Sequence, residues 1–210
     1  MLSNQIYKKF SRILPLKFCI ITIMNTQKIT KNYILIAIGA FLFGFSVKTQ
    51  SNQEVLCEIY FSPGQPCAKK IIERIENARS EILVQSFSFT SIDIANALIS
   101  AHKRGVKVIC IFDSSQEKKI LIHKLAQEGI SVFIDKPAGI AHNKVMIIDD
   151  VIVLTGSYNF TNAAEHRNVE NSIHFENPKI ANEYKEQWKK RLAISKKMDK
   201  ENHFYSNNLR

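Results

Sequence analysis

A histidine, a lysine and an aspartate lie close together in a stretch that otherwise has the composition of a buried strand. His142, Lys144 and Asp149 surround the apolar run Val145 to Ile148, and six residues separate the aspartate from a Gly-Ser pair at 156–157. An uninterrupted apolar run is typical of a strand covered on both faces. Because residues two apart on a strand share a face, His142 and Lys144 are predicted to point the same way. Burying such a lysine is costly without an anionic partner, and a phosphate would be that partner.

These residues resemble the HKD motif of the phospholipase D superfamily, which is His-x-Lys, four residues, Asp, six residues and Gly-Ser. The sequence fits that motif without a gap. The resemblance extends to segments 60–63, 82–90 and 156–161, and it covers roughly residues 55–188. These segments are similar to the short, single-motif bacterial branch. That branch holds both small secreted nucleases and proteins described as phospholipase D.

The resemblance implies a division of roles around one phosphate. Phosphodiester cleavage needs a nucleophile, a proton donor for the leaving oxygen, and positive charge on the equatorial oxygens. His142 would be the nucleophile that forms a phosphohistidine, and Lys144 would stabilise the phosphate oxygens. Ser157 and Asn159 would bind the same phosphate as neutral donors.

Two acidic residues complete the implied site. Glu170 would hold a histidine ring in its reactive tautomer through a hydrogen bond. Asp149 is grouped with the catalytic residues as part of the motif, although its position along the strand also permits a structural or orienting role. No Cys/His cluster has zinc spacing, and no acidic cluster suggests calcium or magnesium. A metal-independent reaction without a cofactor is therefore expected.

A second histidine must protonate the leaving group, but the chain carries only one HKD motif. The five histidines outside the motif are His102, His123, His166, His174 and His203. Two of them fall on predicted solvated helix faces, one in the C-terminal tail and one in a predicted strand. His166 is near the motif and is the alternative donor within one chain. The simpler expectation is a homodimer in which each chain contributes one His142 to a shared active site.

The distribution of charge bears on the substrate. The 210-residue chain has a formal net charge of +10, but residues 1–50 contain seven Lys or Arg and no acid, which leaves +3 for the rest. Residues 186–210 hold seven more against three acids, so the catalytic region is close to neutral. Net charge is then weak evidence for a nucleic-acid surface.

Three functions follow from the motif and this charge distribution. The first is hydrolysis of phospholipid head groups at a membrane surface, such as phosphatidylcholine to phosphatidic acid and choline. The second is a non-specific metal-independent endonuclease acting on nucleic acid. The third is a silent binding or envelope protein on the same fold, against which the complete motif argues.

The N-terminal segment predicts export. Tyr33 to Val47 is an uncharged apolar run of 15 residues behind basic residues, which suits a signal peptide better than a membrane span of about 18 or more. No Ala-x-Ala cleavage site follows, so an uncleaved anchor remains the alternative, and Met24 is an alternative start to Met1. The predicted organisation is a leader over 1–47, a linker over 48–54, a catalytic domain over 55–194 and a charged tail over 195–210. The protein is then secreted, periplasmic or held in the cell envelope.

Strands and helices alternate through the catalytic domain. The strands are predicted at 55–61, 82–87, 106–112, 130–134, the motif strand, 151–154 and 169–175, and the helices at 67–78, 92–103, 117–128 and 181–194. This alternation predicts an α/β sandwich with a mixed β-sheet flanked by helices. Cys57 and Cys67 flank the first turn, and in an exported chain they could form a disulfide.

Overall fold

The structure is a computed structural model that describes residues 55–199. The predicted leader and linker over 1–54, and residues 200–210 of the predicted tail, lie outside the described residues. Within the described range no helix combines the length and the apolar character needed to cross a bilayer.

An eight-stranded mixed sheet forms the centre of the domain, in the order β1-β7-β6-β5-β2-β3-β4-β8. The neighbours β2, β3 and β4 are parallel, and every other pairing is antiparallel. The strands are β1 (Leu56–Ser62), β2 (Glu81–Ser86), β3 (Lys107–Asp113), β4 (Ser131–Asp135), β5 (Lys144–Ile148), β6 (Ile152–Gly156), β7 (Glu170–Glu176) and β8 (Lys196–Lys197). The predicted fold class is confirmed.

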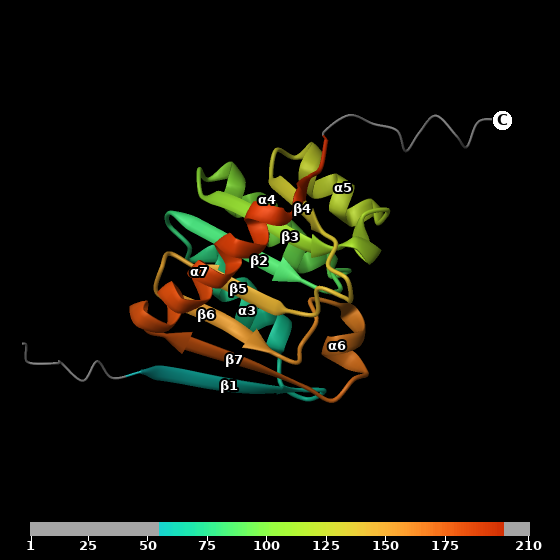
Figure 1. The fold of residues 1–210 in the computed structure, drawn as a ribbon. Coiled ribbons are helices and arrows are strands. Elements are labelled where there is room, and N and C mark those ends of the chain that lie inside the picture. Colours follow the sequence, from blue (N-terminus) through green and yellow to red (C-terminus); the bar gives the residue numbers. More distant parts are fainter. Residues whose placement is uncertain (1–54, 200–210) are drawn as a thin grey trace, which may run out of the picture. The chain divides into compact units, whose positions relative to one another are not determined.

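Helices cover both faces of this sheet (Figure 1). One hydrophobic cluster joins one face to α3 (Cys67–Glu76), α4 (Ile92–Lys103) and α5 (Ile120–Gln127). A second, smaller cluster joins the opposite face to α7 (Pro178–Ile194). Successive side chains of β2 point to opposite faces of the sheet, so Val84 packs in the first cluster and Leu83 in the second.

The predicted elements match the observed ones within a few residues, and α4 matches at both ends. Three short elements were not predicted: the 3-10 turn η1 (Ser114–Gln116), the helix α6 (Asn162–His166) and the strand β8. The segment predicted as a charged tail therefore begins with a strand, since β8 pairs with β4 at the edge of the sheet. Single turns and two-residue strands are too short to leave a periodic pattern.

Cys57 and Cys67 do not form the disulfide that their spacing permits. Cys57 is exposed on β1, whereas Cys67 is buried at the start of α3, and both are free thiols. Cys67 packs in the larger hydrophobic cluster, where burial raises the pKa of its thiol. It therefore behaves as a small core residue.

Asp149, which the motif groups with the catalytic residues, lies in the turn at the far end of β5 from His142 and Lys144. Its carboxylate accepts hydrogen bonds from the backbone N–H groups of Arg79, Ser80 and Glu81 at 2.8–3.0 Å. Burial would raise the pKa of this carboxyl group, but the hydrogen bonds from Glu81 and Ser80 outweigh it and hold the pKa below its ordinary value. Asp149 therefore ties the end of β5 to the start of β2 and does not reach the groove that holds His142.

Candidate active site

A groove of about 740 Å³ opens where α7 leaves one end of the sheet uncovered. Its floor includes Gln85 on β2, Val145 on β5 and Thr155 on β6, which lie on neighbouring strands. Trp188 of α7 forms part of the wall, and its indole N–H donates to the Val84 carbonyl at 3.0 Å. This bond fixes the position of the helix along the groove.

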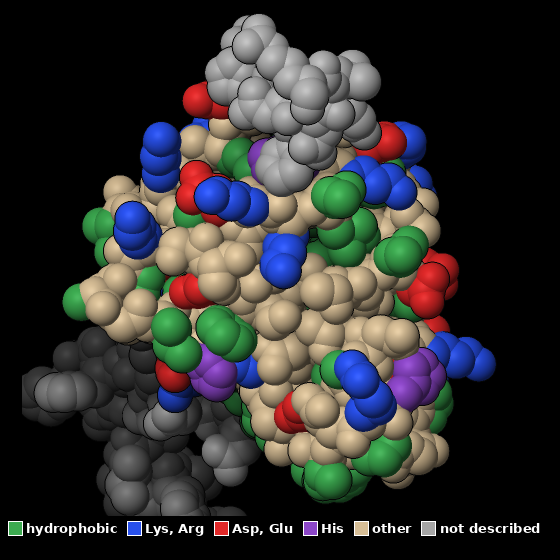
Figure 2. Space-filling view, turned by 90° about the vertical axis from the view of Figure 1, so that its right-hand side faces the viewer, with side chains coloured by type: hydrophobic (Ala, Val, Ile, Leu, Met, Phe, Trp, Pro, Cys, Tyr) green, Lys and Arg blue, Asp and Glu red, His purple; other side chains and the backbone are tan. Residues whose placement is uncertain are grey.

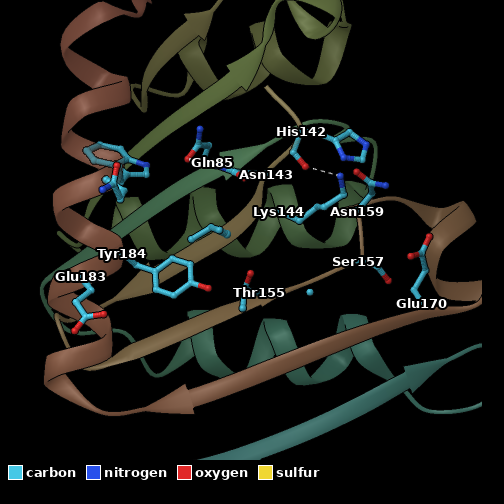
Figure 3. A pocket seen from close by; sticks show the side chains of 14 residues that line it. Gln85, His142, Asn143, Lys144, Thr155, Ser157, Asn159, Glu170, Glu183 and Tyr184 are labelled. Atoms are coloured by element: carbon cyan, nitrogen blue, oxygen red, sulfur yellow. Dashed lines mark hydrogen bonds between the residues drawn. The ribbon is translucent and has the colours of Figure 1, made fainter. Parts of the chain in front are cut away.

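His142 and Lys144 meet at the head of β5, as their spacing predicts (Figure 3). His142 precedes the strand and is exposed, while Lys144 is its first residue and is only 7% exposed. The Lys144 ammonium donates to the His142 carbonyl oxygen at 2.6 Å. An ammonium carries three protons, so two remain to bind phosphate oxygens. Burial lowers the pKa of Lys144, and the nearby carboxylate of Glu170 opposes that shift.

Phe87 touches both of these residues, and sequence reasoning did not single it out. Its ring lies 4.6 Å from the His142 ring between centroids, at an interplanar angle of 57°. The Lys144 nitrogen lies 5.1 Å from the centroid of the same ring. Phe87 follows β2 in a segment that resembles the family, but an aromatic residue there carries no chemical pattern of its own.

Ser157 is held at the groove by a backbone arrangement that requires glycine at position 156. Gly156 has φ +139°, and a Cβ there would lie 2.3 Å from the Asn171 carbonyl oxygen. Ser157 and Tyr158 both donate their backbone N–H groups to that oxygen at 3.1 Å. The Ser157 hydroxyl oxygen accepts the Asn171 N–H at 3.0 Å, so its own proton is free to bind a phosphate oxygen.

Asn159 lies in the same groove beside Lys144 (Figure 3). Its Oδ1 atom is buried and has no hydrogen-bond partner in the described part of the chain. Buried amide oxygens are ordinarily paired, and an unpaired one is destabilising. The Oδ1 atom needs a hydrogen-bond donor, whereas the Nδ2 group of the same amide is the donor that could bind a phosphate oxygen.

Glu170 also lines the groove, but it does not orient His142 within one chain. Its carboxylate accepts a hydrogen bond from the Asn168 amide at 3.0 Å. Among the described residues no hydrogen bond joins it to the His142 ring. The hydrogen bond predicted for it is therefore not formed within a single chain, and what remains is its electrostatic effect on Lys144.

The other described histidines lie outside the groove. His174 is buried, its Nε2 lies 3.0 Å from the Ser172 hydroxyl, and burial lowers the pKa of its ring to about 4. Its burial outside the groove favours a structural role. His166 is exposed at the end of α6 and does not line the groove. Across residues 55–199 no group of three or more His, Cys, Asp or Glu could hold a metal ion.

Comparisons with known proteins agree with this geometry. A family model described as "Cardiolipin synthase, PLD-like domain" matches residues 71–192. A "Phospholipase D" of Rickettsia conorii is 44% identical over 135 residues, which are 63% of this chain and 68% of the relative. A "Mitochondrial cardiolipin hydrolase" of Chlamydomonas reinhardtii is 31% identical, over 64% of this chain and 60% of the relative. The crystal structure of a phospholipase D family member, Nuc from Salmonella typhimurium, matches with a TM-score of 0.66 and 34% identity, over 69% of this chain and 99% of that one.

We expect His142→Asn and Lys144→Ala to abolish phosphodiester cleavage while leaving the fold intact. The first removes the predicted nucleophile, and the second removes the cation predicted to stabilise the developing charge, an effect worth on the order of 100-fold or more. The measurement is kcat/KM on bis(p-nitrophenyl) phosphate, with circular dichroism as the check on folding.

Asp149→Asn is the matched control within the same motif. Its turn has φ 52°, which asparagine tolerates, so the change removes mainly the charged acceptor. We expect a loss of about 1–3 kcal/mol in the free energy of unfolding, with normal activity per folded molecule. Near-normal rates in either active-site variant, or an inactive but folded Asp149→Asn, would contradict these assignments.

Proposed function

The chain belongs to the phospholipase D superfamily and is a phosphodiesterase, and we propose that it hydrolyses phospholipid head groups such as that of phosphatidylcholine. The observation that carries this proposal is the convergence of His142, Lys144, Ser157 and Asn159 at one groove. The imidazole would attack phosphorus, and a nitrogen–phosphorus bond would form as the bond to the head-group oxygen breaks. A second histidine would protonate that oxygen and then activate water. The water would hydrolyse the phosphohistidine and release phosphatidic acid.

The charge of the groove supports a substrate with one phosphate. Lys144 is the single Lys or Arg among its lining residues in the described chain, against the carboxylates of Glu170 and Glu183. A nucleic-acid strand would bring several phosphates, which basic residues ordinarily contact. Figure 2 shows basic side chains standing apart on the molecule's right-hand face in Figure 1, with acidic and hydrophobic side chains between them rather than in a continuous band.

The relatives favour two substrates. The 44% identity to proteins named "Phospholipase D" supports the phospholipid proposal. The likeness to Nuc over nearly the whole of that chain, and to NucT from Helicobacter pylori at 25% identity and a TM-score of 0.64, supports the alternative of a non-specific endonuclease. Both activities would use the same phosphohistidine chemistry. The substrate must therefore be tested directly.

The substrate experiment compares phosphatidylcholine vesicles with plasmid DNA, both in EDTA. We expect choline release from the vesicles and little cleavage of the plasmid, because Lys144 is the groove's only ammonium or guanidinium in the described chain. Activity should persist in the chelator, because in the proposed mechanism a histidine is the nucleophile and a lysine stabilises the phosphate charge, so no metal ion is needed. Cleavage of DNA alone would establish the endonuclease. Loss of activity in EDTA with recovery in magnesium would contradict metal independence.

We propose further that the chain acts outside the cytoplasm. The support is the basic leader and the apolar run Tyr33 to Val47, which have the composition of an export signal or an uncleaved anchor. Cell fractionation and N-terminal sequencing of the protein are the measurements. A full-length chain found only in the cytosol would contradict export.

The active species is proposed to be a homodimer with one composite site. His142 is the single histidine of the described chain that lines the groove, although the reaction needs two. The unpaired Oδ1 of Asn159 faces this same region. Two large apolar side chains near the catalytic residues are also exposed: Ile140 at 60% and Val169 at 91%. A second copy placed on a two-fold axis would supply the second His142 and cover these side chains.

Subunit mixing tests the shared site. Wild-type chains are combined with an excess of His142→Asn chains under conditions that allow exchange. Because a composite site needs two intact histidines, activity should fall as the square of the wild-type fraction. A linear fall with demonstrated exchange, or a fully active monomer by light scattering, would rule out the shared site and return attention to His166.

A further inference from the structure

The Phe87 ring contacts both the His142 ring and the Lys144 ammonium. It follows the end of β2, and its backbone N–H donates to the Asn143 carbonyl oxygen at 2.9 Å. Ser86 and Lys144 are partners in the register between β2 and β5. The backbone of Phe87 is therefore fixed beside the segment that carries His142 and Lys144.

We propose that Phe87 is a positioning residue for catalysis, whose ring holds the His142 imidazole and the Lys144 ammonium in their reactive arrangement. The inference rests on the proposed phosphodiesterase chemistry and adds to it a residue outside the motif. It concerns how the two catalytic groups are held, not which phosphodiester they cleave.

Contact with the Phe87 ring would fix the orientation of the His142 imidazole. His142 is exposed, and among the described residues no hydrogen bond orients its imidazole. The centroid separation of 4.6 Å and the tilt of 57° lie in the range of favourable aromatic pairs. Without this contact the exposed ring would sample several rotamers, and only some of them present a nitrogen to phosphorus.

The same ring also stabilises the positive charge of the Lys144 ammonium. A cation within about 6 Å of an aromatic centroid is attracted by the ring, and the separation here is 5.1 Å. The titratable residues that line the groove around Lys144 are His142, Glu170, Glu183 and Tyr184. Burial lowers the pKa of Lys144, while Glu170 raises it. Contact with the Phe87 ring favours the charged form and therefore acts in the same direction as Glu170.

The test compares Phe87→Leu, which removes the ring at similar size, with Phe87→Tyr, which keeps it. For Phe87→Leu on bis(p-nitrophenyl) phosphate we expect kcat to fall about 10- to 100-fold, because the imidazole and the ammonium are no longer held in their reactive arrangement. The alkaline limb of the pH–rate profile should move to lower pH by about half a unit, because the charged form of Lys144 loses its contact with the ring. Phe87→Tyr should retain both wild-type values.

Phe89→Leu is the matched control, two residues further along the same segment. Phe89 is fully buried against Phe112 and Phe160, at 5.2 and 6.1 Å between ring centroids, and the catalytic groups are not among its aromatic contacts. It should lose stability without moving the alkaline limb. An equal shift in both leucine variants, or an unchanged kcat and limb in Phe87→Leu, would overturn the inference.

A second measurement does not depend on the substrate. NMR titration of ¹³C-labelled lysine reports the pKa of Lys144 directly, and it should be lower by about half a unit in Phe87→Leu. An unchanged Lys144 pKa would overturn the electrostatic part of the inference even if every substrate assay failed. Activity that survives in His142→Asn would instead contradict the proposed function and leave this titration as the deciding result.

Discussion

A partly buried ammonium at the head of a buried strand is the constraint around which this site is built. Lys144 is 7% exposed and its neighbours along β5 are apolar, so water stabilises its charge poorly. Three features of the chain compensate in part: the His142 carbonyl oxygen, the ring of Phe87 and the carboxylate of Glu170. None of these three is an anion at hydrogen-bond distance from the Lys144 ammonium, so its positive charge is not neutralised. The Lys144 ammonium can therefore still attract an anion, such as a phosphodiester, that enters the groove.

The sheet brings together residues that are distant in the sequence. The antiparallel pairings of β5 with β2 and β6, and of β6 with β7, place the ends of four strands side by side. Phe87, His142, Ser157 and Glu170 follow, precede or begin those strands, so each reaches the same edge. At the opposite end of β5, Asp149 accepts hydrogen bonds from the backbone amides of Ser80, just before β2, and of Glu81, its first residue. One motif thus contains a catalytic end and an anchoring end, and a single strand joins them.

Much of this arrangement could be predicted because it is local. The direction shared by His142 and Lys144 follows from strand alternation, and the alternation of apolar segments predicts the layers. The roles of Asp149 and Glu170 could not be predicted in the same way. Asp149 is five residues from Lys144, but the rise of the strand carries it to the other end of the sheet. The position of Glu170 in the groove depends on the residue at which β7 begins. The contribution of Phe87 depends on ring positions across two strands, which sequence spacing does not encode.

Several features of the groove are those that the proposed homodimer would change. Among the described residues the exposed His142 ring has no hydrogen bond, the buried Asn159 Oδ1 has no partner, and Glu170 makes no hydrogen bond to the ring it was expected to orient. In the proposed homodimer, a two-fold related copy would bring a second imidazole ring to the phosphate and a new neighbour to each Glu170. Two Lys144 ammonium groups would then face each other across the axis. Their repulsion would favour binding of the anionic substrate between them, and the same repulsion would weaken the empty dimer.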